Sequence, residues 1–285
     1  GVIGGTSNSI TRLELPSHLS KFASYSITTT TNVLTLDINP AASDISIGYY
    51  AFAHAKIIKY NFPGVKELAT SAFVSAFTTT AFTSDELKTL DFEVVLGDKS
   101  PITKTPNQAF NGLPVESFVI PASIVELGSN TFFNCTRLEN VSFAEGSELT
   151  TVGGTVFGLC QKLASVDFSN ATKLTSFGIQ PFQNCSAMTS FTFPESVQSL
   201  GGIFFEGCTN LTEITLNKNF TPEMLYSLDT SNYTNCIFGS ANNYAPVNVE
   251  NIYVHPENPY FVSEDGILYS ADKSILYFFP PAKDP

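Results

Sequence analysis

The chain has 285 residues, enough for one large or two ordinary domains, and only 14% of them are charged, against roughly 25% in an average soluble protein. The formal net charge is -12 with 14 Lys and Arg residues in total, which argues against a nucleic-acid partner because phosphate binding needs clustered basic side chains. No apolar run approaches the roughly 18 residues that a membrane-spanning helix requires, so the sequence predicts no transmembrane span.

A trio of apolar residues recurs along the whole chain. Two residues separate its first and second members, and one residue separates its second and third members. The last two members alternate with polar neighbours, which is the period of a β-strand with one buried face. The trio therefore predicts about ten coils of 23–25 residues, with one short strand each, at 10–15, 33–38, 57–62, 87–92, 115–120, 138–143, 163–168, 188–193, 211–216 and 249–254.

Residues 127–194 repeat one longer pattern nearly three times, with a period of 25 residues. A glycine follows an apolar residue, a phenylalanine stands four positions after the glycine, and a cysteine stands three positions after the phenylalanine. These positions are Gly128, Phe132 and Cys135, then Gly153, Phe157 and Cys160, then Gly178, Phe182 and Cys185. A period of 20–50 residues is typical of a solenoid, in which each unit buries its apolar side against its neighbours.

The remaining residues of each coil must return the chain to the next strand. We expect this path to consist of tight turns and short helical or 3₁₀ pieces, with right-handed crossovers between parallel strands. Extra residues at 74–86, 93–107 and 217–248 predict insertions on the rim. Within the last insertion, Thr221 and Pro222 are typical of an N-cap and first helical position, so residues 221–228 should begin as a helix.

Beyond residue 254 the pattern changes to short alternating strands. Asp265-Gly266 lies between two apolar runs and is a strong hairpin signal, and a second turn is predicted at 271–274. We therefore divide the chain into a solenoid at 1–254 and a hairpin or meander at 255–285 that covers its end. The alternative is an interruption before further repeats.

The repeat, in the form L-G-x-x-x-F-x-x-C-x-x-L-x-x-I-x-F-P, resembles the leucine-rich repeat of BspA-like bacterial surface proteins. Residues 258–280 also resemble a block common in that family, whereas Ala55 and Ala76 stand where the repeat has cysteine. The resemblance implies an α/β, right-handed solenoid with one parallel sheet on its concave side. It also implies a non-enzymatic protein, secreted or surface-anchored through a segment outside this sequence, that binds host matrix proteins, other cells or glycans. We expect it to be a monomer without a cofactor. The alternative function is a structural spacer or assembly module.

The cysteines are the first candidate site. Cys135, Cys160, Cys185 and Cys208 share one phase and should stack inside the coils, with Cys236 as a fifth position. A metal site or disulfides are possible readings, but free cysteine is among the most buried residue types, so we favour structural thiols. The sequons at Asn134 and Asn184 precede ladder cysteines, so the repeat explains them better than glycosylation does.

The three histidines are the second candidates. His18, His54 and His255 fall in separate coils, and no nucleophile or metal-spaced set accompanies them. A nucleophile needs a base within hydrogen-bond reach, so the sequence predicts neither catalysis nor a metal site.

The outward side chains of the predicted strands form the third candidate site, a small polar row for binding a protein or glycan. They are Lys59, Asn61, Thr89, Asp91, Ser117, Val119, Asn140, Ser142, Ser165, Asp167, Ser190, Thr192, Glu213, Thr215, Asn251 and Tyr253. Solvation alone could explain such a row, and the inserted loops or the C-terminal block are the alternative binding surfaces.

Overall fold

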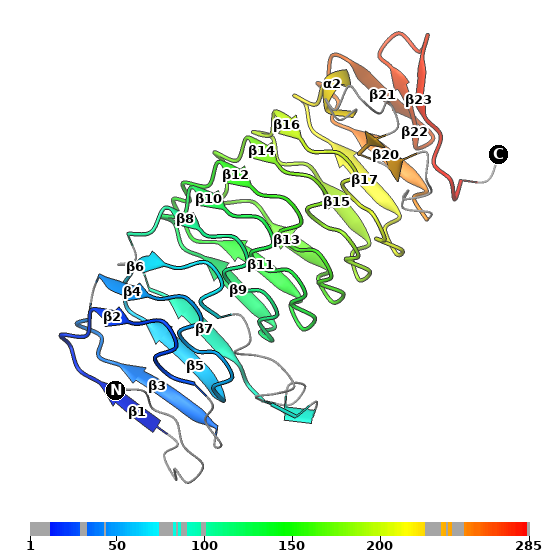
Figure 1. The fold of residues 1–285 in the computed structure, drawn as a ribbon. Helices are drawn as coiled ribbons and strands as arrows, with labels where there is room; N and C mark the ends of the chain where they lie inside the picture. Colours follow the sequence, from blue (N-terminus) through cyan, green and yellow to red (C-terminus); the bar gives the residue numbers. More distant parts are fainter. Residues whose placement is uncertain are drawn as a thin grey trace.

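The computed structural model describes residues 12–28, 33–42, 44–73, 82–83, 85–86, 90–97, 101–225, 235–237, 239–240 and 248–283. These residues form a parallel-strand β-solenoid of about eight turns, with the strands arranged in two rows along its length (Figure 1). The N-terminus lies at one end of the solenoid and the C-terminus at the other (Figure 1).

The first row holds the long strands, which follow the predicted trios. It consists of three parallel sheets in chain order. Their strands are β1 (Arg12–Leu15), β3 (Leu34–Ile38), β5 (Ile57–Phe62) and β7 (Glu93–Leu96); β9 (Ser117–Ile120), β11 (Asn140–Phe143) and β13 (Ser165–Asp167); and β15 (Ser190–Thr192), β17 (Glu213–Leu216) and β20 (Asn251–Val254).

The second row holds shorter strands that lie just before the column of glycines. It comprises a three-stranded and a five-stranded parallel sheet. Their strands are β2 (Lys21–Phe22), β4 (Ile45–Ile47) and β6 (Val65–Leu68), then β8 (Lys104–Thr105), β10 (Glu126–Leu127), β12 (Thr151–Val152), β14 (Ser176–Phe177) and β16 (Ser199–Leu200).

The second row corrects the sequence prediction, which had one strand in each coil. A complete turn carries a long and a short strand, and in the described residues neither β17 nor β20 leads to a short strand of this row. The structure is therefore a β-solenoid of about eight turns in place of the ten α/β coils expected. The helix α2 (Pro222–Leu225) has four residues and starts where Thr221 and Pro222 predicted it.

A column of stacked phenylalanine rings runs through the core and belongs to the predicted glycine-to-phenylalanine spacing. Every ring in it is buried. Ring centroids are 5.3 to 6.4 Å apart for Phe52–Phe73, Phe73–Phe110, Phe110–Phe132, Phe132–Phe157, Phe157–Phe182 and Phe182–Phe205. These separations are those of favourable aromatic pairs, so the column links turn to turn along the solenoid.

The glycine column marks the place where successive turns touch through their backbones. A Cβ on Gly178 would lie 2.5 Å from the nitrogen of Gly154, and one on Gly201 would lie 2.3 Å from the carbonyl carbon of Gly178. At equivalent positions, Ala69 and Pro106 replace glycine. The β4–β6 pairing before Ala69 is irregular, and β6 and β8, which precede Ala69 and Pro106, do not pair. Side-chain volume at this position therefore coincides with the loss of short-strand pairing.

Each turn also bends through residues with positive φ. One column lies two residues after the glycine position, and another directly precedes the cysteine position. The second column has φ between 58° and 74° and consists of His54, Gly112, Asn134, Leu159, Asn184 and Gly207. Asparagine and glycine adopt this left-handed conformation most readily. Backbone geometry therefore accounts for the asparagines that precede Cys135 and Cys185.

The long-strand row is interrupted twice, between β7 and β9 and between β13 and β15. At both interruptions the following strand carries a buried phenylalanine, Phe118 or Phe191, at the middle inward position, where β11 and β13 carry Val141 and Val166. Tyr60 occupies the same position on β5, which pairs with both β3 and β7, so the volume of a ring does not by itself cause an interruption.

The fourth long strand lies four residues later than predicted. The trio at 87–92 predicts a strand around Leu90 and Phe92, but β7 is Glu93–Leu96 and buries Val94 and Leu96. Its register, with Tyr60 opposite Val94 and Phe62 opposite Leu96, follows β5 directly. The insertion predicted at 93–107 is therefore partly strand. Most of the insertion at 74–86 lies outside the described residues.

The chain ends in an antiparallel meander of β21 (Phe261–Glu264), β22 (Ile267–Ser270) and β23 (Leu276–Phe278). Asp265 and Gly266 have φ of 49° and 76°, as the predicted Asp-Gly turn requires. The turn meets the last long strand, where Ile252 donates its N–H to the Gly266 carbonyl at 2.9 Å. The hand of the coil, the curvature of the long-strand row and the proposed domain division stay predictions.

Candidate functional site

The outward side chains of the long-strand row form one face, which we call the strand face. Parallel pairing aligns the predicted residues turn by turn: Asn140 lies between Ser117 and Ser165, and Glu213 lies between Ser190 and Asn251. The second alignments are Val119, Ser142 and Asp167, and Thr192, Thr215 and Tyr253. Lys59 and Asn61 lie opposite Glu93 and Val95 on β7.

Two predicted members of the strand face need correction because β7 begins later than expected. Thr89 lies outside the described residues. Asp91 precedes β7, and the outward positions on that strand belong to Glu93 and Val95. Asp91 nevertheless lies at the face, since Lys59 donates a hydrogen bond to its carboxylate at 3.1 Å.

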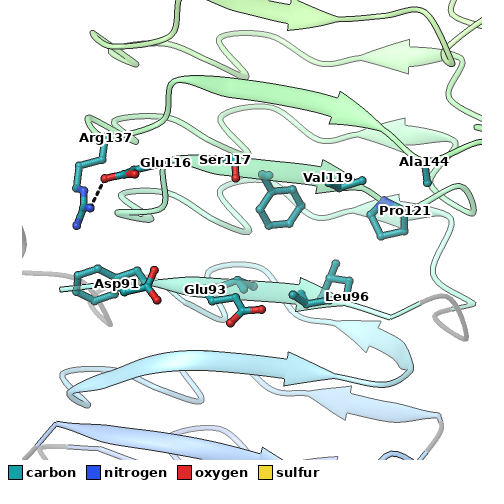
Figure 2. Close-up of a pocket in the computed structure, with 13 residues that line it drawn as sticks. Asp91, Glu93, Leu96, Glu116, Ser117, Val119, Pro121, Arg137 and Ala144 are labelled. Atoms are coloured by element: carbon teal, nitrogen blue, oxygen red, sulfur yellow. Dashed lines mark hydrogen bonds and ion pairs between the residues drawn. The ribbon is translucent and has the colours of Figure 1, made fainter.

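The first interruption of the long strands opens a cavity in this face of about 480 Å³, which we call the β7–β9 slot. Figure 2 shows Asp91 and Glu93 along one side of the slot and Ser117 and Val119 along the other. The described lining residues are Asp91, Phe92, Glu93, Val94, Val95, Leu96, Glu116, Ser117, Phe118, Val119, Pro121, Arg137 and Ala144. The slot thus combines the edges of two strands with charged and aliphatic side chains.

Arg137 closes one end of the slot and joins the turns on its two sides. Its guanidinium donates to the Leu90 carbonyl at 2.8 Å and to Glu116 at 2.5 Å, and it lies 5.9 Å from the centroid of the Phe92 ring. The side chain is only 15% exposed. A half-buried guanidinium held by a carboxylate, a carbonyl and an aromatic face has little freedom, so Arg137 fixes the position of Glu116.

Carboxylates gather at the same end of the slot. Lys59 contacts Asp91 at 3.1 Å and Glu93 at 3.6 Å, and these two contacts raise the Lys59 pKa, Asp91 contributing most. The side chains of Asp91, Glu93 and Glu116 are 85%, 49% and 61% exposed. Exposed ion pairs contribute little to stability, so these carboxylates remain available to a charged ligand.

Two further hollows lie on the solenoid. One, of about 570 Å³, coincides with the second interruption and is lined by Val166, Phe168, Phe193 and neighbouring residues. The other, of about 760 Å³, lies between β20 and the meander, and His255 is among its lining residues. His255 accepts a hydrogen bond from the Glu257 N–H, whereas His18 and His54 lie on distant turns. The described part of the chain contains no group of three or more His, Cys, Asp or Glu residues placed to hold a metal ion.

The cysteines in phase lie inside the turns. Cys135, Cys160, Cys185 and Cys208 are buried and carry free thiols. Each donates a hydrogen bond of 3.0–3.3 Å to a phenylalanine carbonyl of the preceding turn, at Phe110, Phe132, Phe157 and Phe182 in order. Burial raises the pKa of Cys135 and Cys185, and raises that of Cys208 to about 12. A thiol in this state is a poor nucleophile.

Cys236 differs from these four cysteines in its backbone surroundings. It lies on β18 (Asn235–Cys236), which pairs antiparallel with β19 (Gly239–Ser240). Its side chain is outside the description, so its place as a fifth ladder position stays a prediction.

The sequence matches the BspA type leucine-rich repeat region in six copies, over residues 5–93 and 103–239. The chain belongs to the BspA-type leucine-rich repeat family. No curated protein matches it. The structure describes no helix that is long and apolar enough to cross a membrane.

Solved structures of bacterial repeat proteins are similar to the chain at low identity. A leucine-rich repeat protein from Eubacterium ventriosum is 21% identical, with a TM-score of 0.49, over 64% of this chain and 45% of that protein. A leucine-rich cell surface protein from Faecalibacterium prausnitzii is 17% identical, with a TM-score of 0.44, over 86% of this chain and 59% of that protein. The chain therefore spans less than two thirds of the length of either protein.

The slot itself was not predicted from the sequence. Glu93 and Val95 were missed because the predicted strand lay four residues too early. Glu116 directly precedes β9, and Arg137 comes from the turn after β9, so neither is an outward residue of a strand. The β-branched and apolar run Val94-Val95-Leu96 could have located β7 if it had been compared with the register of β5. No pattern in the sequence could have placed Arg137 beside Leu90, which is 47 residues away.

Proposed function

We propose that this protein binds a macromolecular partner, a protein or a glycan, through the strand face, and that it does so outside the bacterial cell or at its surface. The family, whose repeats build extended surfaces, and the small polar side chains that align across neighbouring turns support this function. The observation that carries it is the β7–β9 slot, where the polar face opens into a cavity with aliphatic walls and a charged end.

Binding fits this site better than catalysis. The carboxylates at the slot are exposed and paired with Lys59 and Arg137, and the buried thiols are held by backbone carbonyls. A catalytic site aims its polar groups at one reacting position and excludes water from it. The strand face instead presents its groups side by side over many turns, which suits a large partner.

An array of matrix proteins and glycans, probed with the full chain, tests the proposed function. A triple variant of the face, Asp91→Asn, Asp167→Asn and Glu213→Gln, should bind any captured partner at least tenfold more weakly. A matched triple variant outside the face, Glu67→Gln, Glu145→Gln and Glu257→Gln, removes the same charge and should keep binding within twofold.

If both triple variants bind the partner equally weakly, the strand face has no specific role, and the loss of affinity comes from the change in net charge. If the array captures no partner, the alternative of a structural spacer is favoured, because a spacer needs no ligand of its own.

A further inference from the structure

The β7–β9 slot exposes strand edges that the rest of the fold pairs. In the described residues β7 pairs only with β5, and β9 pairs only with β11, so their facing edges have no strand partner. Cα atoms of β7 and β9 nevertheless approach within 8 Å, which is too close for another strand to fit between them. A ligand therefore lies across the opening of the slot and contacts it through side chains.

Exposed aliphatic side chains also gather at the slot. Val95 on β7 and Val119 on β9 are 37% and 59% exposed, and they are the only exposed aliphatic residues on the long strands that the structure describes. Their counterparts on the neighbouring strands are polar, with Asn61 opposite Val95 and Ser142 opposite Val119. An aliphatic side chain of a ligand would remove both valines from water.

The charged end of the slot lies two residues from the aliphatic part. Glu93 precedes Val95 by two positions on β7, as Ser117 precedes Val119 on β9, and in a strand such residues share one face. Asp91, Glu93 and Glu116 supply three carboxylates against the two cations Lys59 and Arg137. The local charge is thus negative, and the whole chain, at -12, would also attract a basic ligand.

We propose that the slot binds an extended peptide segment of a protein partner, with Lys or Arg at one position and Val, Ile or Leu two positions away. The inference rests on the proposed function and specifies its ligand. The basic side chain faces Asp91, Glu93 and Glu116, and the aliphatic side chain packs against Val95 and Val119.

Selection from a displayed library of random seven-residue peptides on the immobilised full chain tests this. We expect enrichment of a Lys or Arg separated by one residue from Val, Ile or Leu. The most enriched peptide, made with a fluorescent label, is then titrated against purified protein by anisotropy. Replacing its Lys or Arg by Gln, or its Val, Ile or Leu by Ser, should weaken binding at least tenfold in each case.

A matched pair of double variants locates the bound peptide. Glu93→Gln with Val119→Thr alters both parts of the slot and should weaken peptide binding at least tenfold. Glu145→Gln with Ile275→Thr also removes one carboxylate and one exposed aliphatic side chain, but away from the slot and the strand face, and should change affinity less than twofold. Thermal unfolding of each variant shows that its fold is intact.

Failure of this inference is distinct from failure of the proposed function. Selection without the expected motif, or equal affinity for the two double variants, would overturn the peptide slot. If an array partner still binds the Glu93→Gln, Val119→Thr protein normally but not the triple variant of the strand face, the face is functional and its ligand does not use the slot.

Discussion

Glycine has a packing role in this solenoid that the spacing alone does not reveal. Gly153, Gly178 and Gly201 lie directly over the backbone of the preceding turn, and no positive φ is involved. Gly146 differs, because its φ of 73° requires a left-handed conformation while a Cβ there would meet nothing within 4 Å. Substitutions at Gly178 and Gly146 therefore separate the effect of backbone contact on stability from the effect of backbone conformation.

Gly178→Ala should destabilise the protein much more than Gly146→Ala. A Cβ at 178 would lie 2.5 Å from the nitrogen of Gly154, so neighbouring turns must move apart, at a cost of about 3 kcal/mol or more. At 146 only the φ penalty applies, about 1 kcal/mol. Urea unfolding gives both free energies, and similar values for the two variants would show that the turns are not in close backbone contact.

At the scale of elements, one buried asparagine joins the meander to the last turns. Asn258 donates to the carbonyls of Asn217 and Phe220, and its side-chain oxygen accepts from the N–H groups of Tyr260 and Phe261, all at 2.9 Å. The residue is 8% exposed. It belongs to the block at 258–280 that resembles the family, so a physical role can be given to part of that block.

Asn258→Ala should lower the free energy of unfolding by about 2–4 kcal/mol, because four hydrogen bonds disappear and buried backbone groups lose their partners. Hydrogen exchange should become faster in β21 and β22 than in β11 and β13. Asn210→Ala is the control, since its exposed amide makes a single hydrogen bond to the Ser186 carbonyl and should cost about 0.5 kcal/mol or less. Uniform exchange across all strands would argue against a docking role for Asn258.

At the scale of the molecule, the two rows of strands are interrupted at different places around one turn. The long strand β7 pairs with the N-terminal turns, whereas the short strand β8 pairs with the C-terminal turns. The phenylalanine column continues through this turn, where Phe110 packs against Phe73 at 5.5 Å and Phe132 at 5.4 Å. Ring packing therefore couples two groups of turns whose sheets are separate.

Phe110→Ala should separate the unfolding of the N-terminal and C-terminal turns. Phe157→Ala lies inside the continuous C-terminal turns. Each of the two substitutions should lower the free energy of unfolding by roughly 3–5 kcal/mol, but in Phe157→Ala unfolding should stay a single transition. Pulsed hydrogen exchange across a urea series, read at β3 and β5 against β11 and β13, distinguishes the two variants. Coincident transitions in Phe110→Ala would show that the paired strands of this turn suffice for coupling.

The sequence by itself determined the repeat, its phase and the residues that face the core. The spacing of glycine, phenylalanine and cysteine depends on contacts between equivalent positions of neighbouring turns, so it can be read without knowing the coordinates. The Asp265-Gly266 turn was equally local, because its conformation depends on those two residues.

Only the tertiary structure decided the second strand row, the interruptions and the slot. Strands of two residues, such as β10 and β12, are too short to show a period, and their pairing depends on how closely the backbones approach. The gap between β7 and β9 separates two groups of paired strands, and the position of β7 depends on the register that it inherits from β5. These are relations between turns, and a pattern within one turn does not contain them.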